Sequence, residues 1–151
     1  MRKTFSLNEQ RLKTIVAESI KKVLKEEKSN DIDNIIVDLL SYLHNMQKPL
    51  REIHWNTDEY ALHMVTDETI DDVLEWEDSL AETFISDTNN KIRIKDTNLQ
   101  NSYEQLMKDL IELTSTVKNK ITDNKSYDNI CAVVDEILEK SNQLLYKSKL
   151  K

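Results

Sequence analysis

Residues 31–46 read DIDNIIVDLLSYLHNM, and the apolar side chains in this stretch recur every three or four positions. This spacing places them on one face of an α-helix, which turns once in about 3.6 residues. The face consists of Ile32, Ile35, Ile36, Leu39, Leu40, Leu43 and Met46. The stretch therefore predicts a long helix with one buried side. Pro49 follows it, and there we expect the helix to kink or restart, because proline lacks the backbone N–H.

The composition extends this helical prediction to the whole chain. Its 151 residues include no glycine and a single proline. Phosphate-cradling loops, dinucleotide-binding turns and nucleophile elbows need glycine for positive φ or for close approach of the backbone, so these classes of site are excluded. Tight hairpins also favour glycine. The chain therefore suits one soluble domain built from long helices and short polar loops.

Further helices are predicted on both sides of residues 31–46. Ser6 is a candidate N-cap for an amphipathic N-terminal helix, and Lys28-Ser29-Asn30 reads as the linker that ends it. The other helices are expected at about residues 58–85, 99–121 and 126–149. Between them, residues 86–98 form a polar connector in which Ile92 and Ile94 indicate a short extended segment. We expect an all-α fold: a four-helix bundle at 31–151 with an additional amphipathic helix at 1–30.

Charge is distributed unevenly between these parts. Residues 1–30 carry eight Lys/Arg against four Asp/Glu, whereas residues 31–98 carry five against sixteen. The acidic centre argues against nucleic acid as a partner there, and the basic N-terminal segment supports DNA binding only weakly. That segment either packs on the bundle or a neighbouring chain, or serves as a separate arm that docks a protein partner.

The compartment is inferred from what the sequence lacks. No apolar run approaches the roughly 20 residues that cross a bilayer, and the first residues lack the apolar core of a signal peptide. Cys131 is the only cysteine, so an internal disulfide is impossible. These observations predict a cytoplasmic protein with no membrane partner.

Two pairs of possible metal ligands share one helical spacing. His63 and Asp67 lie four residues apart, and Asp78 and Glu82 repeat that spacing further along the same predicted helix. Other carboxylates, Asp71 and Glu75, fall near the same line. Carboxylates beside core positions are costly unless a partner neutralises them. Mixed nitrogen and oxygen donors suit Fe(II), Mn(II) or Zn(II), and structural zinc sites are usually richer in thiolate than this chain permits.

These residues resemble the Dps mini-ferritins, a ferritin-like family. The resemblance is carried by His54-Trp55-Asn56, by Ala61-Leu62-His63 and by the 63-67-78-82 spacing. It implies a ferritin-like four-helix bundle that binds iron and oxidises Fe(II) with peroxide or dioxygen. It also implies a homodimer or larger homo-oligomer. In that arrangement His54, His63 and Asp67 of one subunit face Asp78 and Glu82 of a two-fold mate.

The chain departs from the family pattern at three points. The interval from His54 to His63 is shorter than in typical members, Pro49 lies close to His54, and the N-terminal helix replaces a flexible lysine-rich tail. The shortened interval resembles compact bacteriophage proteins, which would place the chain in a host cytoplasm or a virion. The alternative function is therefore a non-enzymatic ferritin-like structural or interaction protein.

The remaining distinctive side chains have structural interpretations. We expect His44 to be a partly buried helix residue and Cys131 to lie in the core. We expect Trp55 and Trp76 to pack or to contact a second subunit. Beside an iron centre, Trp55 would also be an accessory residue that drains oxidising equivalents.

Overall fold

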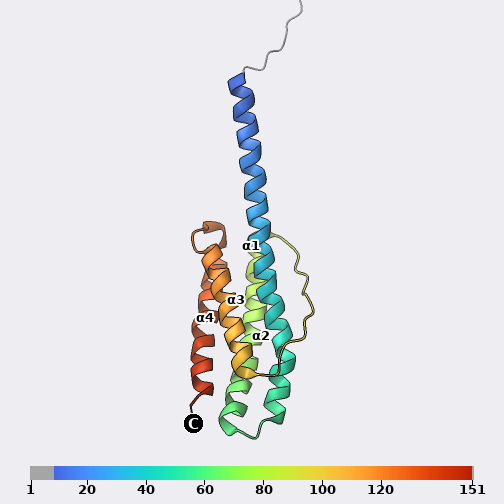
Figure 1. The fold of residues 1–151 in the computed structure, drawn as a ribbon, viewed down its shortest axis with the longest axis vertical. Helices are drawn as coiled ribbons and strands as arrows, with labels where there is room; N and C mark the ends of the chain where they lie inside the picture. The colour runs from blue at the N-terminus through green and yellow to red at the C-terminus, as the bar shows by residue number, and fades with distance from the viewer. Residues whose placement is uncertain (1–8, 151) are drawn as a thin grey trace, which may run out of the picture. The chain divides into compact units, whose positions relative to one another are not determined.

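The computed structural model describes residues 9–150, apart from the side chains of residues 26–29. It contains α1 (Glu9–Asn56), α2 (Tyr60–Thr88), α3 (Tyr103–Ile121), the 3-10 helix η1 (Lys125–Tyr127) and α4 (Asp128–Ser148) (Figure 1). No strand occurs in this part of the chain, so the all-α prediction is confirmed there. The proposed cap at Ser6 lies outside the described residues.

The chain divides into two compact units, Met1–Asp33 and Asn34–Lys151. The predicted linker at residues 28–30 does not end a helix, because α1 continues through it to Asn56. None of the three linker residues is proline or glycine, the only residue types that carry a large penalty inside a helix. The separate helices predicted on either side of residue 30 are therefore one continuous element.

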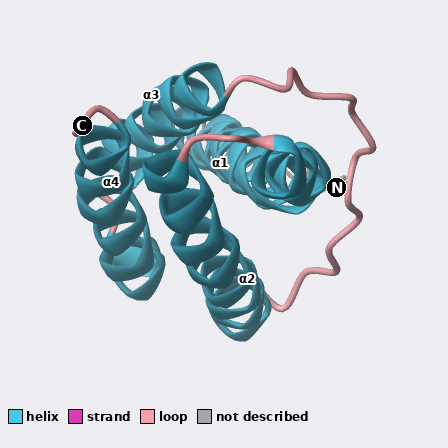
Figure 2. Ribbon diagram, turned by 90° about the horizontal axis from the view of Figure 1, so that it is seen from below, coloured by secondary structure: helices cyan, strands magenta, loops and turns pink. Residues whose placement is uncertain are grey.

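The unit from Asn34 onward is a bundle formed by the second part of α1 together with α2, α3 and α4 (Figure 2). Most of the α1 face predicted from the sequence is buried in it: Ile36, Leu39, Leu40, Leu43 and Met46 are fully covered, whereas Ile35 is only partly buried. Helix α4 packs against both α2 and α3. The Tyr42 hydroxyl donates a hydrogen bond of 2.7 Å to the Leu106 carbonyl and so ties α1 to α3. The four-helix bundle is confirmed.

Pro49 lies inside α1 without ending it, so the expected restart of the helix is wrong. Its ring is buried and lines a cavity that Leu99 and Asn101 also line. Proline costs the helix one backbone hydrogen bond, the one that would reach the Asn45 carbonyl. Burial of an apolar ring offsets that cost, which explains how the helix continues for about two more turns and brings His54 close to its end.

Helix α2 ends at an asparagine that takes the place of the missing glycine. Asn89 adopts a left-handed conformation, with φ 56°, and its N–H donates to the Ile85 carbonyl. Asparagine is the usual substitute for glycine at this position. The predicted connector accordingly begins three residues later than expected, and residues 89–102 contain neither helix nor strand. The extended segment expected around Ile92 and Ile94 does not form part of a sheet, and α3 begins at Tyr103, after the N-cap Ser102.

Candidate metal centre

A turn of three residues, 57–59, joins α1 to α2 and places two histidines against each other. His54 lies in the last turn of α1 and His63 in the first turn of α2. The Thr57 side chain accepts a hydrogen bond from the Glu59 N–H, which tightens the turn. As a result the two imidazole rings stack with their centroids 4.0 Å apart and their planes 20° from parallel.

Reciprocal hydrogen bonds fix the orientation of both rings. His54 Nδ1–H donates to the His63 carbonyl at 3.0 Å, and His63 Nδ1–H donates to the His54 carbonyl at 2.9 Å. A carbonyl oxygen only accepts, so each ring must carry its proton on Nδ1 when neutral. The Thr66 hydroxyl lies 3.3 Å from His54 Nδ1 as a second acceptor. Each neutral ring is therefore left with its lone pair on Nε2, and backbone carbonyls hold metal-ligating histidines in this same way.

Asp67 places a carboxylate next to one of these lone pairs. Its Oδ1 lies 3.9 Å from His54 Nε2. The His54 side chain is 18% exposed and that of Asp67 is 63% exposed, so the gap opens toward solvent. Donor atoms on one metal ion, at bond lengths of about 2.0–2.2 Å, lie at most about 4.4 Å apart. The separation of the two atoms therefore fits a shared divalent cation.

The other predicted ligands, Asp78 and Glu82, do not join this group within one chain. Helix α2 is continuous across residues 63–82, as predicted. At about 1.5 Å per residue, Asp78 lies about 16 Å along the helix from Asp67. Both side chains are exposed. Within the described part of one chain, no group of three or more His, Cys, Asp or Glu side chains is arranged to hold a metal ion.

The carboxylate row on α2 lies on the face opposite the core. The acidic side chains of Asp67, Asp71, Glu75, Asp78 and Glu82 are all exposed. The expectation that these acids crowd against core positions is therefore wrong for a single chain. The core side is formed by Val65, Val73, Trp76, Leu80 and Phe84, about 180° around the helix. Apolar side chains accompany the acids on the outer face: Tyr60, Met64, Leu74 and Ile85 are 77%, 49%, 41% and 48% exposed.

A polar cluster that the sequence did not reveal links α2 to α4. Lys140 Nζ lies 2.9 Å from Glu68 Oε1, and Lys147 Nζ lies 3.1 Å from the same oxygen. These hydrogen bonds lower the pKa of Glu68. Burial raises the pKa of the neighbouring Asp72 carboxyl, which lies 3.9 Å from Lys140 Nζ and makes no hydrogen bond through Oδ2. No motif predicts this cluster, because its members come from distant positions that only the bundle brings together.

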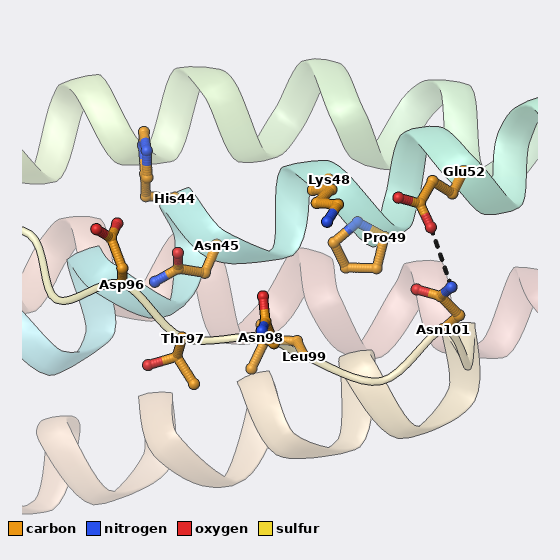
Figure 3. A pocket seen from close by; sticks show the side chains of 10 residues that line it. All are labelled: His44, Asn45, Lys48, Pro49, Glu52, Asp96, Thr97, Asn98, Leu99 and Asn101. Atoms are coloured by element: carbon orange, nitrogen blue, oxygen red, sulfur yellow. Dashed lines mark hydrogen bonds between the residues drawn. The ribbon is translucent and has the colours of Figure 1, made fainter.

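The connector at residues 89–102 forms the wall of a cavity of about 500 Å³ against α1 (Figure 3). Asn45 Nδ2 donates to the Lys95 carbonyl at 2.6 Å, and Asn101 Nδ2 donates to Glu52 Oε2 at 3.0 Å. The lining mixes the Lys48 ammonium with the carboxylates of Glu52 and Asp96 and several amides. None of the predicted metal ligands lines this cavity, so it is separate from the histidine pair.

The other distinctive residues divide between the core and the surface. Trp76 is buried, as a packing residue should be, whereas Trp55 is 69% exposed next to His54. The His44 side chain is about half exposed, and its Nδ1 lies 2.7 Å from Glu77 Oε1. Cys131 is only half buried, so the expectation that it lies in the core is wrong; burial nevertheless raises the pKa of its thiol.

Comparison with known proteins places the chain in a family without assigning a function. Among the described residues, no helix has the length and apolar character needed to cross a membrane. No curated protein and no solved structure matches the chain. A family model described as a family of unknown function (DUF5856) matches residues 54–148, which is more than half of the sequence and includes all five predicted ligands. The chain therefore belongs to the DUF5856 family.

Proposed function

We propose that this protein binds Fe(II) at a site shared by two copies of the chain and oxidises it in the manner of a mini-ferritin. One copy would supply His54, His63 and Asp67, and the other would supply Asp78 and Glu82. The observation that carries the proposal is the fixed orientation of the two imidazoles. Their Nδ1–H groups are bound to carbonyls, so both Nε2 lone pairs are available, and one faces the Asp67 carboxylate across 3.9 Å.

The spacing along α2 supports sharing between two-fold mates. In an antiparallel pair of helices, a two-fold axis brings together residues equally far from it on opposite sides. His63 and Glu82 share one midpoint with Asp67 and Asp78, between residues 72 and 73. One axis would therefore bring Glu82 against His63 of the partner subunit and Asp78 against Asp67 of the partner subunit. The same axis would bring Tyr60 against Ile85 of the partner subunit, covering apolar side chains that are exposed in the single chain.

The donor set also fits the proposed substrate. Imidazole nitrogen and carboxylate oxygen together suit Fe(II), and they also admit Mn(II) and Zn(II). Iron would supply the redox chemistry, and the chain would hold it and balance its charge. Each of two Fe(II) ions gives one electron to peroxide, whose O–O bond breaks; two protons then complete two water molecules. Dioxygen is the alternative oxidant. Binding should weaken at low pH, because protons compete with the metal for Nε2.

The test is an anaerobic addition of Fe(II) to the purified protein, followed by peroxide, with ferric absorbance recorded over time. Wild type should oxidise Fe(II) faster than buffer, and His63→Ala should reduce the rate to the buffer level. His44→Ala is the matched control, because His44 is also an exposed helix residue but its Nδ1 is bound to Glu77. Zn(II), which cannot be oxidised, should compete with Fe(II) and inhibit the reaction.

Equal traces from wild type and His63→Ala would end the proposal of iron oxidation. The chain would then be better explained as a non-enzymatic interaction bundle. If His63→Ala and His44→Ala abolish oxidation equally, the loss reflects general damage to the bundle and not the loss of a metal site. Circular dichroism of each variant separates these cases. Both substitutions should leave the helical content unchanged, whereas damage to the bundle would lower it.

A further inference from the structure

Within the unit Met1–Asp33, the first part of α1 presents a stripe of apolar side chains. Six aliphatic side chains between residues 12 and 24 are each about half exposed: Leu12 49%, Ile15 45%, Val16 49%, Ile20 54%, Val23 53% and Leu24 56%. At 100° per residue they occupy an arc of about 180° of the helix surface. This arc is much wider than the narrow seam of a two-stranded coiled coil, whose apolar positions are only two in seven.

The remaining surface of the same segment is basic. Residues 9–25 contain five Lys/Arg against two Glu. On the helical wheel, Arg11, Lys21, Lys22 and Lys25 lie outside the apolar arc, and Lys13 lies at its edge. All of these side chains are exposed. The segment is therefore half aliphatic and half cationic, so its partner must offer apolar surface bordered by negative charge.

Two partners that the chain itself could offer do not meet that requirement. A second copy of the segment would bring two helices of the same net positive charge together. The acidic face of α2 in a second copy has the opposite charge, but its carboxylates lie in the middle of that face. Aliphatic side chains packed on that face would cover carboxylates, and buried carboxylates without a partner cost several kcal/mol each.

We propose that residues 9–25 bind in the plane of an anionic lipid bilayer. The aliphatic arc would enter the boundary between headgroups and acyl chains, while the Lys and Arg side chains would reach the phosphates around it. Anionic headgroups satisfy both needs, because their charge lies above the apolar layer. The carboxylate of residues 9–25 that falls within the arc, Glu9, is the first residue of α1, at the end of the segment. The inference is independent of the metal site. It departs from the expectation of no membrane partner, which rested on the lack of a segment long enough to span the bilayer.

The test is flotation of the full-length protein with phosphatidylcholine vesicles that contain or lack phosphatidylglycerol in equal proportion. Wild type should float with the anionic vesicles and bind at least tenfold more weakly to the neutral ones. Ile20→Asp should reduce binding at least tenfold, because it places a charge in the aliphatic arc. Tyr146→Asp is the control: Tyr146 is exposed on α4, outside both the aliphatic arc and the proposed dimer face, and its replacement should leave flotation unchanged.

A charge reversal, Lys21→Glu together with Lys22→Glu, should also abolish flotation while keeping the aliphatic arc intact. Circular dichroism should show that every variant keeps its helical content. Failure of wild type to float with anionic vesicles would overturn the proposal, as would equal flotation of Ile20→Asp. If wild type does not float, and Ile20→Asp lowers the mass in solution, the partner of this segment is a second copy of the chain.

Discussion

Dimer formation should depend on the metal if two copies share the site. The proposed two-fold pairing brings together ten carboxylates, five from the α2 face of each chain: Asp67, Asp71, Glu75, Asp78 and Glu82. Without a cation these acids repel one another, and they oppose the burial of the apolar side chains on the same face. We therefore predict that the metal-free protein is mainly monomeric at micromolar concentration and dimerises when Fe(II) is added under anaerobic conditions.

The size of this effect follows from the symmetry of the pair. A two-fold dimer contains two equivalent sites, each taking donors from both chains. Free metal at 100 times the dissociation constant stabilises each occupied site by about 2.7 kcal/mol relative to the unbound form. Two sites give about 5.4 kcal/mol, which tightens dimerisation about 10⁴-fold. A dimer whose dissociation constant is millimolar without metal would then have a submicromolar dissociation constant.

Sedimentation equilibrium with and without anaerobic Fe(II) measures this shift directly. Glu82→Gln should abolish the response to metal, although it should not weaken association in the absence of metal, because it removes one charge from a repelling row. Glu112→Gln is the control, since Glu112 is an exposed acid on α3, away from the α2 face. An equal response to Fe(II) in wild type and Glu82→Gln would refute the shared site, and so would a monomer at every metal concentration.

Three further predictions concern the stability of the bundle, measured by urea unfolding. Asp72→Asn should stabilise it slightly at pH 7, because the folded-state pKa of Asp72 is raised; the gain should disappear as the pH falls toward 3.8. Lys140→Met should cost about 0.5–1 kcal/mol at pH 7. The folded-state pKa of Glu68 is lowered, so this contribution is complete above about pH 4.5 and is lost as the pH falls through the folded-state value. Phe84→Ala should lower the free energy of unfolding by about 3–5 kcal/mol at any pH, since Phe84 is 1% exposed. A smaller decrease would mean that neighbouring core side chains fill the space left by the ring.

The helices were predictable where apolar residues recur at the helical period, and their ends were less predictable. Ile36, Leu39 and Leu43 are buried as the periodicity requires. The linker at residues 28–30 was predicted from its polarity alone, but polar residues without glycine or proline continue a helix at little cost. Leu99 was placed at the start of a helix, whereas it lines the cavity beside the connector. A single apolar residue does not establish whether it belongs to a helix or to a loop.

The proximity of His54 and His63 was predictable from the sequence, whereas the tautomers of the two rings were not. The short interval between His54 and His63 across a turn predicts that the two rings are close. Their tautomers depend on where the two backbone carbonyls lie, and only the folded turn determines this. Similarly, the sequence places Asp67 and Asp71 on one line, but whether that line faces the core depends on how α2 packs against α4.

The outer face of α2 combines two properties that conflict in a single chain in water. Exposed Tyr60, Met64 and Ile85 favour burial against a partner, and the carboxylates between them oppose it. A basic protein partner could neutralise the acids, but it would leave the orientation of the histidines at one end of the face without a role. Divalent cations held between two-fold mates would offset the charge of the carboxylates that bind them and would use the Nε2 lone pairs at once. The decisive property is therefore the joint dependence of dimerisation on metal, Glu82 and His63, because a basic protein partner would require Glu82 without requiring His63.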